Sequence, residues 1–290
     1  MARWYRDGPR RRNALDLPRP APGLLRLLAG ALAAGVGLAA LFLAAQRRFL
    51  YFPERQDLDA SLRDASRLGF DPLQNRHGAL LGWRSPHPSG RAEATAIVLH
   101  GNAGQALHRT YLPRVLQGPG VPPLDVILLE YPGYGPRPGR PTEASLVEAA
   151  VEAVDQAAPA GPILLVGESL GTGVASLAAA RRPRLVRGLL LVTPLASVPA
   201  VTRRHAPLVP GFLLRDRYEA GPALARFGGP VVFLVAGDDE VVFADLGRGL
   251  HDGYPGPRRL VVQEGASHNG LRYDPLDPTW REAVSFLLAR

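Results

Sequence analysis

A serine flanked by two glycines is the feature of this sequence that most directly suggests chemistry. Residues 167–171 read GESLG and fit the pattern Gly-x-Ser-x-Gly. They follow the apolar run ILLV and open the helix-compatible run VASLAAA. A serine on a sharp turn from strand to helix is held in a strained conformation, and small glycines let neighbouring chain pack close to it. This context predicts Ser169 as a nucleophile, although glycine turns also join strands to helices for structural reasons alone.

Candidates for an acid and for a base follow two later apolar runs, in the order along the chain that such a nucleophile requires. An acid and then a histidine are expected after the serine, each just beyond a strand. Asp238 and Asp239 follow the run VVFLV, and His268 follows RLVVQE. His268 would take the proton of Ser169, while the acid would orient the imidazole and stabilise its cation. Spacing alone does not choose between the two aspartates, and His251, inside an expected helix, is the weaker alternative base.

A glycine-rich turn, HGNAG at 100–104, follows an earlier apolar strand. Tight turns of this kind expose backbone N–H groups. We expect the backbone N–H of Asn102 and that of Leu170 to form an oxyanion hole, each worth roughly 100- to 1000-fold in rate. The alternative is an ordinary turn at the end of a strand. His100 precedes the nucleophile by two strands, so we predict that it packs structurally and is not the base.

An alternation of strands and helices would position these residues. Strands are expected at 96–100, 125–131, 163–167, 188–193, 231–236 and 259–263, and helices at 107–116, 143–158, 170–181, 244–251 and 279–288. Most of the strands are continuously apolar, as strands covered on both faces are. The pattern predicts an α/β fold with a doubly wound, mostly parallel sheet, and antiparallel edge strands near 73–83. The stretch 194–229 is rich in proline and longer than a normal connection, which predicts an insertion that forms a lid or a pocket wall.

The N-terminal segment has a different character. Residues 27–45 are 19 consecutive residues without a charge, and a helix of that length measures about 28 Å, close to the ~30 Å hydrocarbon core of a bilayer. We predict a flexible tail rich in Arg and Pro at 1–23, a single transmembrane helix at 24–46 and a catalytic domain at 47–290. A cleaved signal peptide is the alternative, but its apolar core is usually about 7 to 15 residues long. The arginine distribution slightly favours a cytoplasmic N-terminus, which would place the catalytic domain outside the cytoplasm.

Composition excludes several other classes of function. The net charge is +8, but residues 1–26 hold seven arginines and two aspartates and so supply +5 of it. The remaining +3 is too dilute for the basic face that nucleic-acid binding needs. The chain has no cysteine, which excludes disulfides, thiolate metal sites and cysteine nucleophiles. We expect no metal and no cofactor.

Taken together, the motifs resemble those of the α/β-hydrolase superfamily, particularly its single-pass membrane members, which include bacterial hydrolases related to protein depalmitoylases. The segments QRRFLYFP at 46–53, HGNAG, EYPGYG at 130–135 and the serine motif occur in the same order as in those relatives. The resemblance extends from about Gln46 to the C-terminus. It implies Asp239 as the acid and His268 as the base. Phe243 stands where relatives commonly have a proline after the acid, and the tyrosine-glycine loop begins differently.

The activity expected from these residues is hydrolysis of an acyl ester or thioester through a covalent acyl-Ser169 intermediate. The expected substrate is a small or lipid-like acyl compound. A peptidase or amidase would use the same triad. A membrane-tethered binding module without catalytic activity is the alternative from another class, because a fold alone does not guarantee a function.

Overall fold

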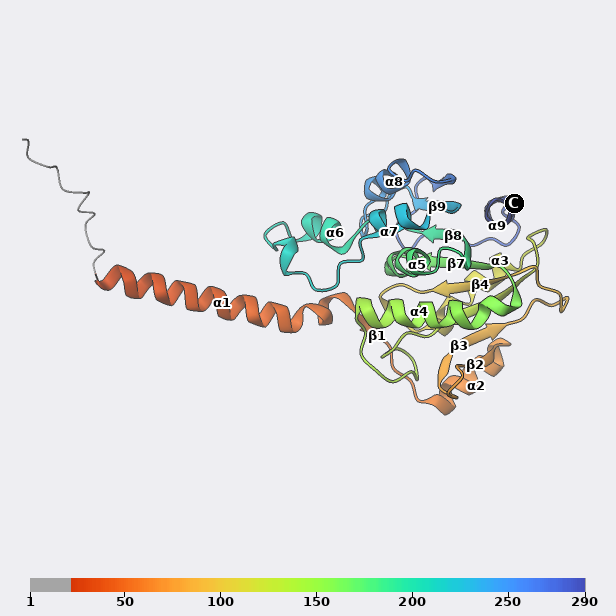
Figure 1. Cartoon of the computed structure of the whole chain (residues 1–290), viewed down its shortest axis with the longest axis horizontal. Coiled ribbons are helices and arrows are strands. Elements are labelled where there is room, and N and C mark those ends of the chain that lie inside the picture. The colour runs from red at the N-terminus through yellow and green to blue at the C-terminus, as the bar shows by residue number, and fades with distance from the viewer. Residues whose placement is uncertain (1–21, 290) are drawn as a thin grey trace, which may run out of the picture. The chain divides into compact units, whose positions relative to one another are not determined.

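The computed structural model describes residues 22–289. The chain divides into two compact units, residues 1–44 and 45–290. Helix α1, Pro22–Leu50, supplies the described part of the first unit and continues into the second (Figure 1). The stretch Ala29–Leu50 is long and apolar enough to span a membrane. The tail predicted at 1–23 lies outside the described residues except for its last two positions.

An eight-stranded sheet forms the centre of the second unit, in the order β10-β9-β8-β7-β4-β6-β3-β2. The strands are β2 Asp71–Gln74, β3 Leu80–Ser85, β4 Ala94–Leu99, β6 Leu124–Leu129, β7 Ile163–Glu168, β8 Val186–Val192, β9 Val231–Ala236 and β10 Arg258–Gln263. Neighbours from β10 to β6 pair in parallel, whereas β3 and β2 are antiparallel. The predicted mostly parallel sheet with antiparallel edge strands is confirmed. A separate short parallel pair joins β1, Phe52–Pro53, to β5, Ala103–Gly104.

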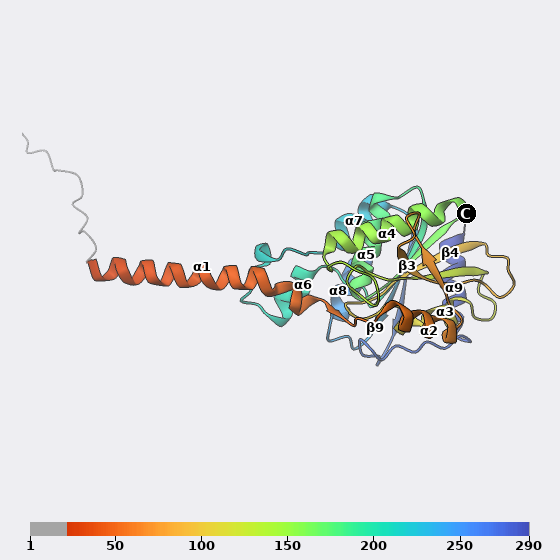
Figure 2. The same ribbon diagram turned by 90° about the horizontal axis from the view of Figure 1, so that it is seen from below.

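Helices cover both faces of this sheet, because its strands are apolar on both sides. In β4, Ile97 and Leu99 belong to one core cluster, while Ala96 and Val98 belong to the other, as the period of two along a strand requires. The first cluster includes side chains of α4 Glu143–Ala157, α5 Leu170–Arg181 and α7 Ala220–Phe227. The second includes side chains of α2 Leu58–Leu68, α3 Tyr111–Leu116 and α9 Pro278–Leu288. Figure 2 shows these two groups on opposite sides of the sheet.

The helices differ from the prediction in two ways: one expected helix is split, and the expected insertion contains helices of its own. The expected helix 107–116 is split into a 3-10 turn, Ala106–Arg109 (η1), and α3. The 3-10 turn η2, Ala158–Ala160, follows α4. The stretch 194–229 folds into α6 Val198–His205, a 3-10 turn η3 Gly211–Leu213, and α7. Helix α8, Ala244–Asp252, lies close to its predicted range.

Candidate active site

Ser169 occupies the sharp turn between β7 and α5. Its φ of 52° and ψ of −120° are unusual for a residue with a side chain, and such strain costs on the order of 1–3 kcal/mol. The backbone N–H of Ser169 donates to the carbonyl of Val192, 2.9 Å away. A Cβ on Gly171 would lie 1.9 Å from the carbonyl oxygen of Leu99, and one on Gly167 would lie 2.6 Å from the oxygen of Gly171. Both glycines are therefore required for the turn to form.

His268 joins this serine to an aspartate from the neighbouring part of the sheet. Its Nε2 lies 3.0 Å from Oγ of Ser169, and its Nδ1 lies 2.8 Å from Oδ2 of Asp239. The three residues stand at or just beyond the C-terminal ends of β7, β9 and β10, where the sequence placed them. With the ring proton on Nδ1, His268 donates to the carboxylate and can accept the serine proton at Nε2.

Asp239 is the aspartate that contacts the histidine. It is buried, and its Oδ1 accepts hydrogen bonds from the backbone N–H groups of Val241 and Val242, each at 2.9 Å. Burial would raise the pKa of the Asp239 carboxyl, but the hydrogen bond and charge of His268 and the two N–H donors outweigh it, so the pKa lies below its ordinary value. Asp238 is exposed. The structure thus distinguishes the two aspartates, which spacing alone did not.

The other histidines considered from the sequence lie elsewhere. His251 is in α8, where its Nδ1 contacts Asp252. His100 is buried, with Nδ1 2.8 Å from the carbonyl of Gly101 and its ring 4.2 Å from that of Tyr131. Burial above all, together with a nearby arginine, lowers the pKa of His100 to about 3, so it stays neutral at physiological pH. These contacts agree with the structural role that we predicted for it.

The glycine-rich turn at 100–104 lies against the serine and is held by several hydrogen bonds. A Cβ on Gly101 would lie 3.5 Å from that of Ser169. The carbonyl of Asn102 accepts from the N–H of Phe52 at 2.9 Å and from the Tyr134 hydroxyl at 2.7 Å. The Asn102 side chain donates to the carbonyl of Leu50 at 2.9 Å. These bonds fix the backbone of Asn102 beside the serine.

Leu170 is the first residue of α5, so its N–H has no partner within that helix. Within residues 22–289, neither this N–H nor that of Asn102 donates to another backbone group. Both N–H groups are therefore free of backbone partners, which is what an oxyanion hole would require.

Two cavities meet at Ser169. One has a volume of about 270 Å³ and is lined mainly by apolar side chains, among them Leu50, Leu195, Val198, Val201 and Val242. The other, of about 570 Å³, is lined by polar groups that include Arg109, Tyr111, Glu168, His268 and Tyr273. The predicted insertion 194–229 supplies Leu195 and the residues of α6 to the apolar cavity. Within the described residues, no cluster of His, Asp and Glu suited to a metal ion is found.

A polar cluster around Glu168, the residue before the nucleophile, was not predicted. Oε2 of Glu168 lies 2.8 Å from Nε of Arg109, and Oε1 accepts hydrogen bonds from the hydroxyls of Tyr111 and Tyr273. The side chains of Arg109 and Glu168 are only 15% and 14% exposed. The partners come from segments far apart in the chain, so no local pattern could reveal them. The cluster holds the end of β7 in place next to Ser169.

Replacing Glu168 with alanine should destabilise the fold, because it leaves the mostly buried charge of Arg109 without its partner. We expect a loss of about 3 kcal/mol in the free energy of unfolding, measured by urea denaturation of the full chain in detergent. Asp155→Ala is the matched control, since the pair of Asp155 and Arg182 is exposed, and it should cost less than about 1 kcal/mol. Equal losses in the two variants would contradict an anchoring role for Glu168.

Comparison with known proteins identifies the family. The family model described as the alpha/beta hydrolase fold matches residues 97–226. An uncharacterized protein of Mycobacterium tuberculosis is 33% identical over 252 residues, which cover 80% of this chain and 84% of that protein. This chain belongs to the α/β-hydrolase fold family.

Solved structures show the same fold at lower sequence identity. Est1E from Butyrivibrio proteoclasticus, solved with bound ferulic acid, superposes with a TM-score of 0.61 at 17% identity, covering 73% of this chain and 95% of that one. A monoacylglycerol lipase from Paleococcus ferrophilus gives a TM-score of 0.52 at 21% identity, covering 71% and 98%. These likenesses confirm the fold class that the sequence predicted, and membership of the α/β-hydrolase fold family supports a hydrolase activity.

Proposed function

We propose that this α/β hydrolase is a serine hydrolase that cleaves an acyl ester or thioester through an acyl-Ser169 intermediate. The observation that carries the proposal is the continuous hydrogen-bonded chain from Ser169 through His268 to Asp239, with the serine on a strained turn. A binding module without catalytic activity predicts a broken triad. The distances of 3.0 and 2.8 Å instead support a working one.

The reaction follows from this geometry. Nε2 of His268 takes the hydroxyl proton as Oγ of Ser169 attacks the carbonyl carbon of the substrate. The oxygen that becomes negative is held by the backbone N–H groups of Asn102 and Leu170. When the tetrahedral intermediate collapses, the bond to the leaving group breaks and His268 gives its proton to that group. A water molecule, activated by His268, then releases the acid and restores the serine.

Labelling with a fluorophosphonate tests this proposal. The probe phosphonylates an activated serine with loss of fluoride, so labelling of the full chain should map to Ser169 and disappear in Ser169→Ala. A folded sample that takes up no label would favour the silent binding module.

The apolar cavity beside Ser169 favours an acyl chain as its occupant. Replacing Val198, which lines this cavity from α6, with tryptophan should fill part of it. Because pocket contacts distinguish acyl chains by about 1–3 kcal/mol, kcat/KM for a dodecanoate ester should fall roughly ten-fold or more, with a much smaller change for an acetate ester. Leu185→Trp, at an exposed position outside the cavity, is the control. An equal loss for both esters would argue against acyl binding there.

We propose further that α1 is an uncleaved membrane anchor, with the catalytic domain outside the cytoplasm. The uncharged stretch 27–45, with 19 residues, exceeds the usual ~7 to 15 residues of a signal peptide core. Resistance of the protein to carbonate extraction would support the anchor. Protease accessibility on sealed cells would report the orientation.

A further inference from the structure

Three of the most exposed large apolar side chains of the second unit belong to two segments that are joined by hydrogen bonds. Leu208 is 94% exposed and Phe212 is 83% exposed, both in the segment 206–213 between α6 and α7, which we name the insertion tip. Phe49, in the last turn of α1, is 75% exposed. Single exposed apolar residues are common on protein surfaces, so their placement is what matters here.

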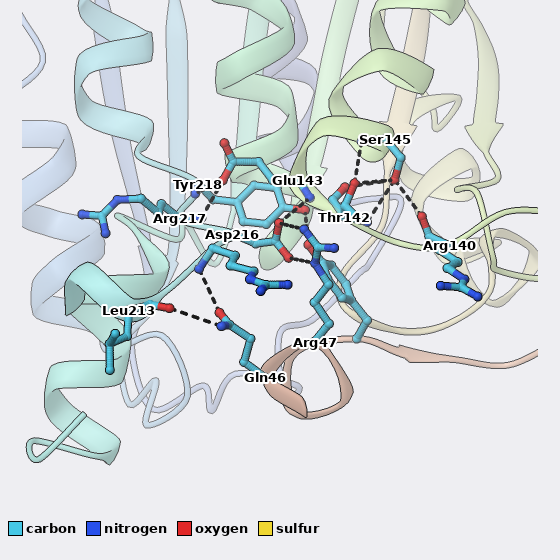
Figure 3. Close-up of polar contacts among 12 residues, drawn as sticks. Gln46, Arg47, Arg140, Thr142, Glu143, Ser145, Leu213, Asp216, Arg217 and Tyr218 are labelled. Carbon is cyan, nitrogen blue, oxygen red and sulfur yellow. Dashed lines mark hydrogen bonds and ion pairs between the residues drawn. The ribbon is translucent and has the colours of Figure 1, made fainter. Parts of the chain in front are cut away.

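The end of α1 is fastened to the insertion tip through Gln46. Its side-chain Nε2 donates to the carbonyl of Leu213 at 3.2 Å, and its Oε1 accepts from the N–H of Arg215 at 2.8 Å (Figure 3). Phe49 also shares the lining of the apolar cavity with Ala206, the first residue of the tip. The last turn of α1 and the insertion tip therefore form one continuous surface.

An ion pair next to Gln46 makes this junction rigid. Nε and Nη2 of Arg47 lie 2.7 and 3.1 Å from the two carboxylate oxygens of Asp216, which is buried. Asp216 also accepts from the N–H of Glu143 at the start of α4. The Glu143 carboxylate in turn accepts from the backbone N–H groups of Arg217 and Tyr218 (Figure 3). A bidentate pair of this kind fixes orientation as well as distance.

Chain connectivity places this junction at the end of the apolar helix. Gln46 directly follows the uncharged stretch 27–45, so a bilayer crossed by that stretch has its surface at Gln46. A segment hydrogen-bonded to Gln46 must lie at the same level. Arg48 is two positions after Gln46, Arg215 donates its backbone N–H to Gln46, and Arg203 belongs to α6. All three side chains are exposed, and none of them forms an ion pair within the described residues. Exposed apolar side chains among arginines match the interface of an anionic bilayer.

We propose that Phe49, Leu208 and Phe212 form a lipid-contact surface that inserts into the interface of the bilayer in which α1 is anchored. The apolar cavity at Ser169 then receives acyl substrates from the lipid phase, because its walls include Leu50 and α6, which flank this surface. This inference rests on the proposed anchor and, for the fate of the acyl chain, on the proposed hydrolase activity.

Single cysteines test the surface directly, since the chain has none of its own. The full chain carrying Leu208→Cys or Phe212→Cys is labelled with an NBD fluorophore and reconstituted in vesicles of phosphatidylcholine and phosphatidylglycerol that carry nitroxide-labelled lipid. Leu276→Cys is the control, because Leu276 is 75% exposed, lies two residues before α9, and follows Pro275, which packs against Gly118 just after α3. Helices α3 and α9 lie at the opposite end of the domain from α6 (Figures 1 and 2). We expect blue-shifted emission and strong quenching at positions 208 and 212, and water-like, weakly quenched emission at 276.

Three other results of this experiment would overturn the proposal, and each would point to a different cause. Vesicle flotation of the protein with water-like emission at all three positions would refute the lipid-contact surface and leave the anchor standing. Failure to float would refute both. Emission at 208 and 212 that varies with the ratio of protein to lipid, without quenching, would mean contact with a second copy instead. None of these readouts depends on catalysis, so failure of the hydrolase proposal is detected separately by the loss of fluorophosphonate labelling.

The double variant Leu208→Ser/Phe212→Ser provides an activity test. Hydrolysis of a long-chain ester embedded in vesicles should fall at least about five-fold, because burial of two large apolar side chains is lost. Hydrolysis of a soluble butyrate ester should be unchanged, since neither residue lines a cavity at Ser169. Equal rates of the variant and the parent on the embedded ester would contradict delivery from the lipid.

Discussion

Replacement of Ser169 with alanine is expected to lower turnover by on the order of a million-fold, because the nucleophile and its base act as one unit. The Oγ of Ser169 makes the hydrogen bond with His268, and alanine removes it with little change in volume. The strained turn should persist, since it depends on the adjacent glycines and on the backbone bond to Val192. Steady-state hydrolysis of a chromogenic ester by the purified full chain provides the measurement.

Because Ser169 and His268 act together, we expect that the losses of activity caused by replacing each of them do not add. His268→Ala should cost about as much as Ser169→Ala, and the double variant should be no slower than either single variant. Ser89→Ala, on an exposed loop, is the control and should retain parental activity. A double variant far slower than both single variants, or substantial activity in Ser169→Ala, would show that another group performs the attack.

The strands and the triad positions could be predicted because their signals are local. Continuously apolar runs identify strands covered on both sides, and the C-terminal ends of parallel strands meet at one edge of a sheet, which brings Ser169, Asp239 and His268 together. The sequence also carries local signals for both ends of α2. The side chain of Asp57 caps its first turn, and Gly69 ends it at a φ of 78°.

Other features of the fold and the site could not be predicted, because they arise from contacts between residues far apart in the sequence. The helices within 194–229 have eight residues each, with Pro199 and Pro222 in their first turns, so their apolar periodicity is too short to read from the sequence. The partners of Glu168 lie about 60 residues before it and about 105 residues after it. Spacing did not choose between Asp238 and Asp239, and only the family resemblance implied Asp239. The physical reasons for that choice, the burial of Asp239 and its two backbone donors, appear only in the folded chain.

The structure gives a physical reason for one departure from the family pattern. Phe243 has a φ of 66°, which the ring of proline cannot adopt, so this chain has no place for the proline found there in relatives. The strained aromatic residue packs against α6, with His205 4.8 Å away and Arg204 above its ring. Because Phe243 is the N-cap residue of α8 and lies four residues after Asp239, these contacts connect the pocket-lining α6 to the segment that holds the acid.

Asp239→Asn should reduce kcat by about 10⁴-fold while leaving the fold intact. The Asp239 carboxylate is ionised at neutral pH, since its pKa lies below the ordinary value, and it accepts the proton on Nδ1 of His268. An asparagine can present its NH₂ group to Nδ1, which forces the ring proton onto Nε2. In that tautomer Nε2 cannot accept the proton of Ser169, so the nucleophile loses its base.

Asp238→Asn is the matched control, because it makes the same chemical change one residue away on an exposed side chain. It should alter kcat by no more than about two-fold, in keeping with the small effect of most surface substitutions. Pre-steady-state and steady-state kinetics of both variants, with circular dichroism to verify folding, decide between the two aspartates. If Asp238→Asn were the slow variant, the acid would have to reach His268 through a different arrangement of the loop after β9. The backbone donors Val241 and Val242, which fix Oδ1 of Asp239 and thereby aim Oδ2 at the histidine, would then have no catalytic role to explain their placement.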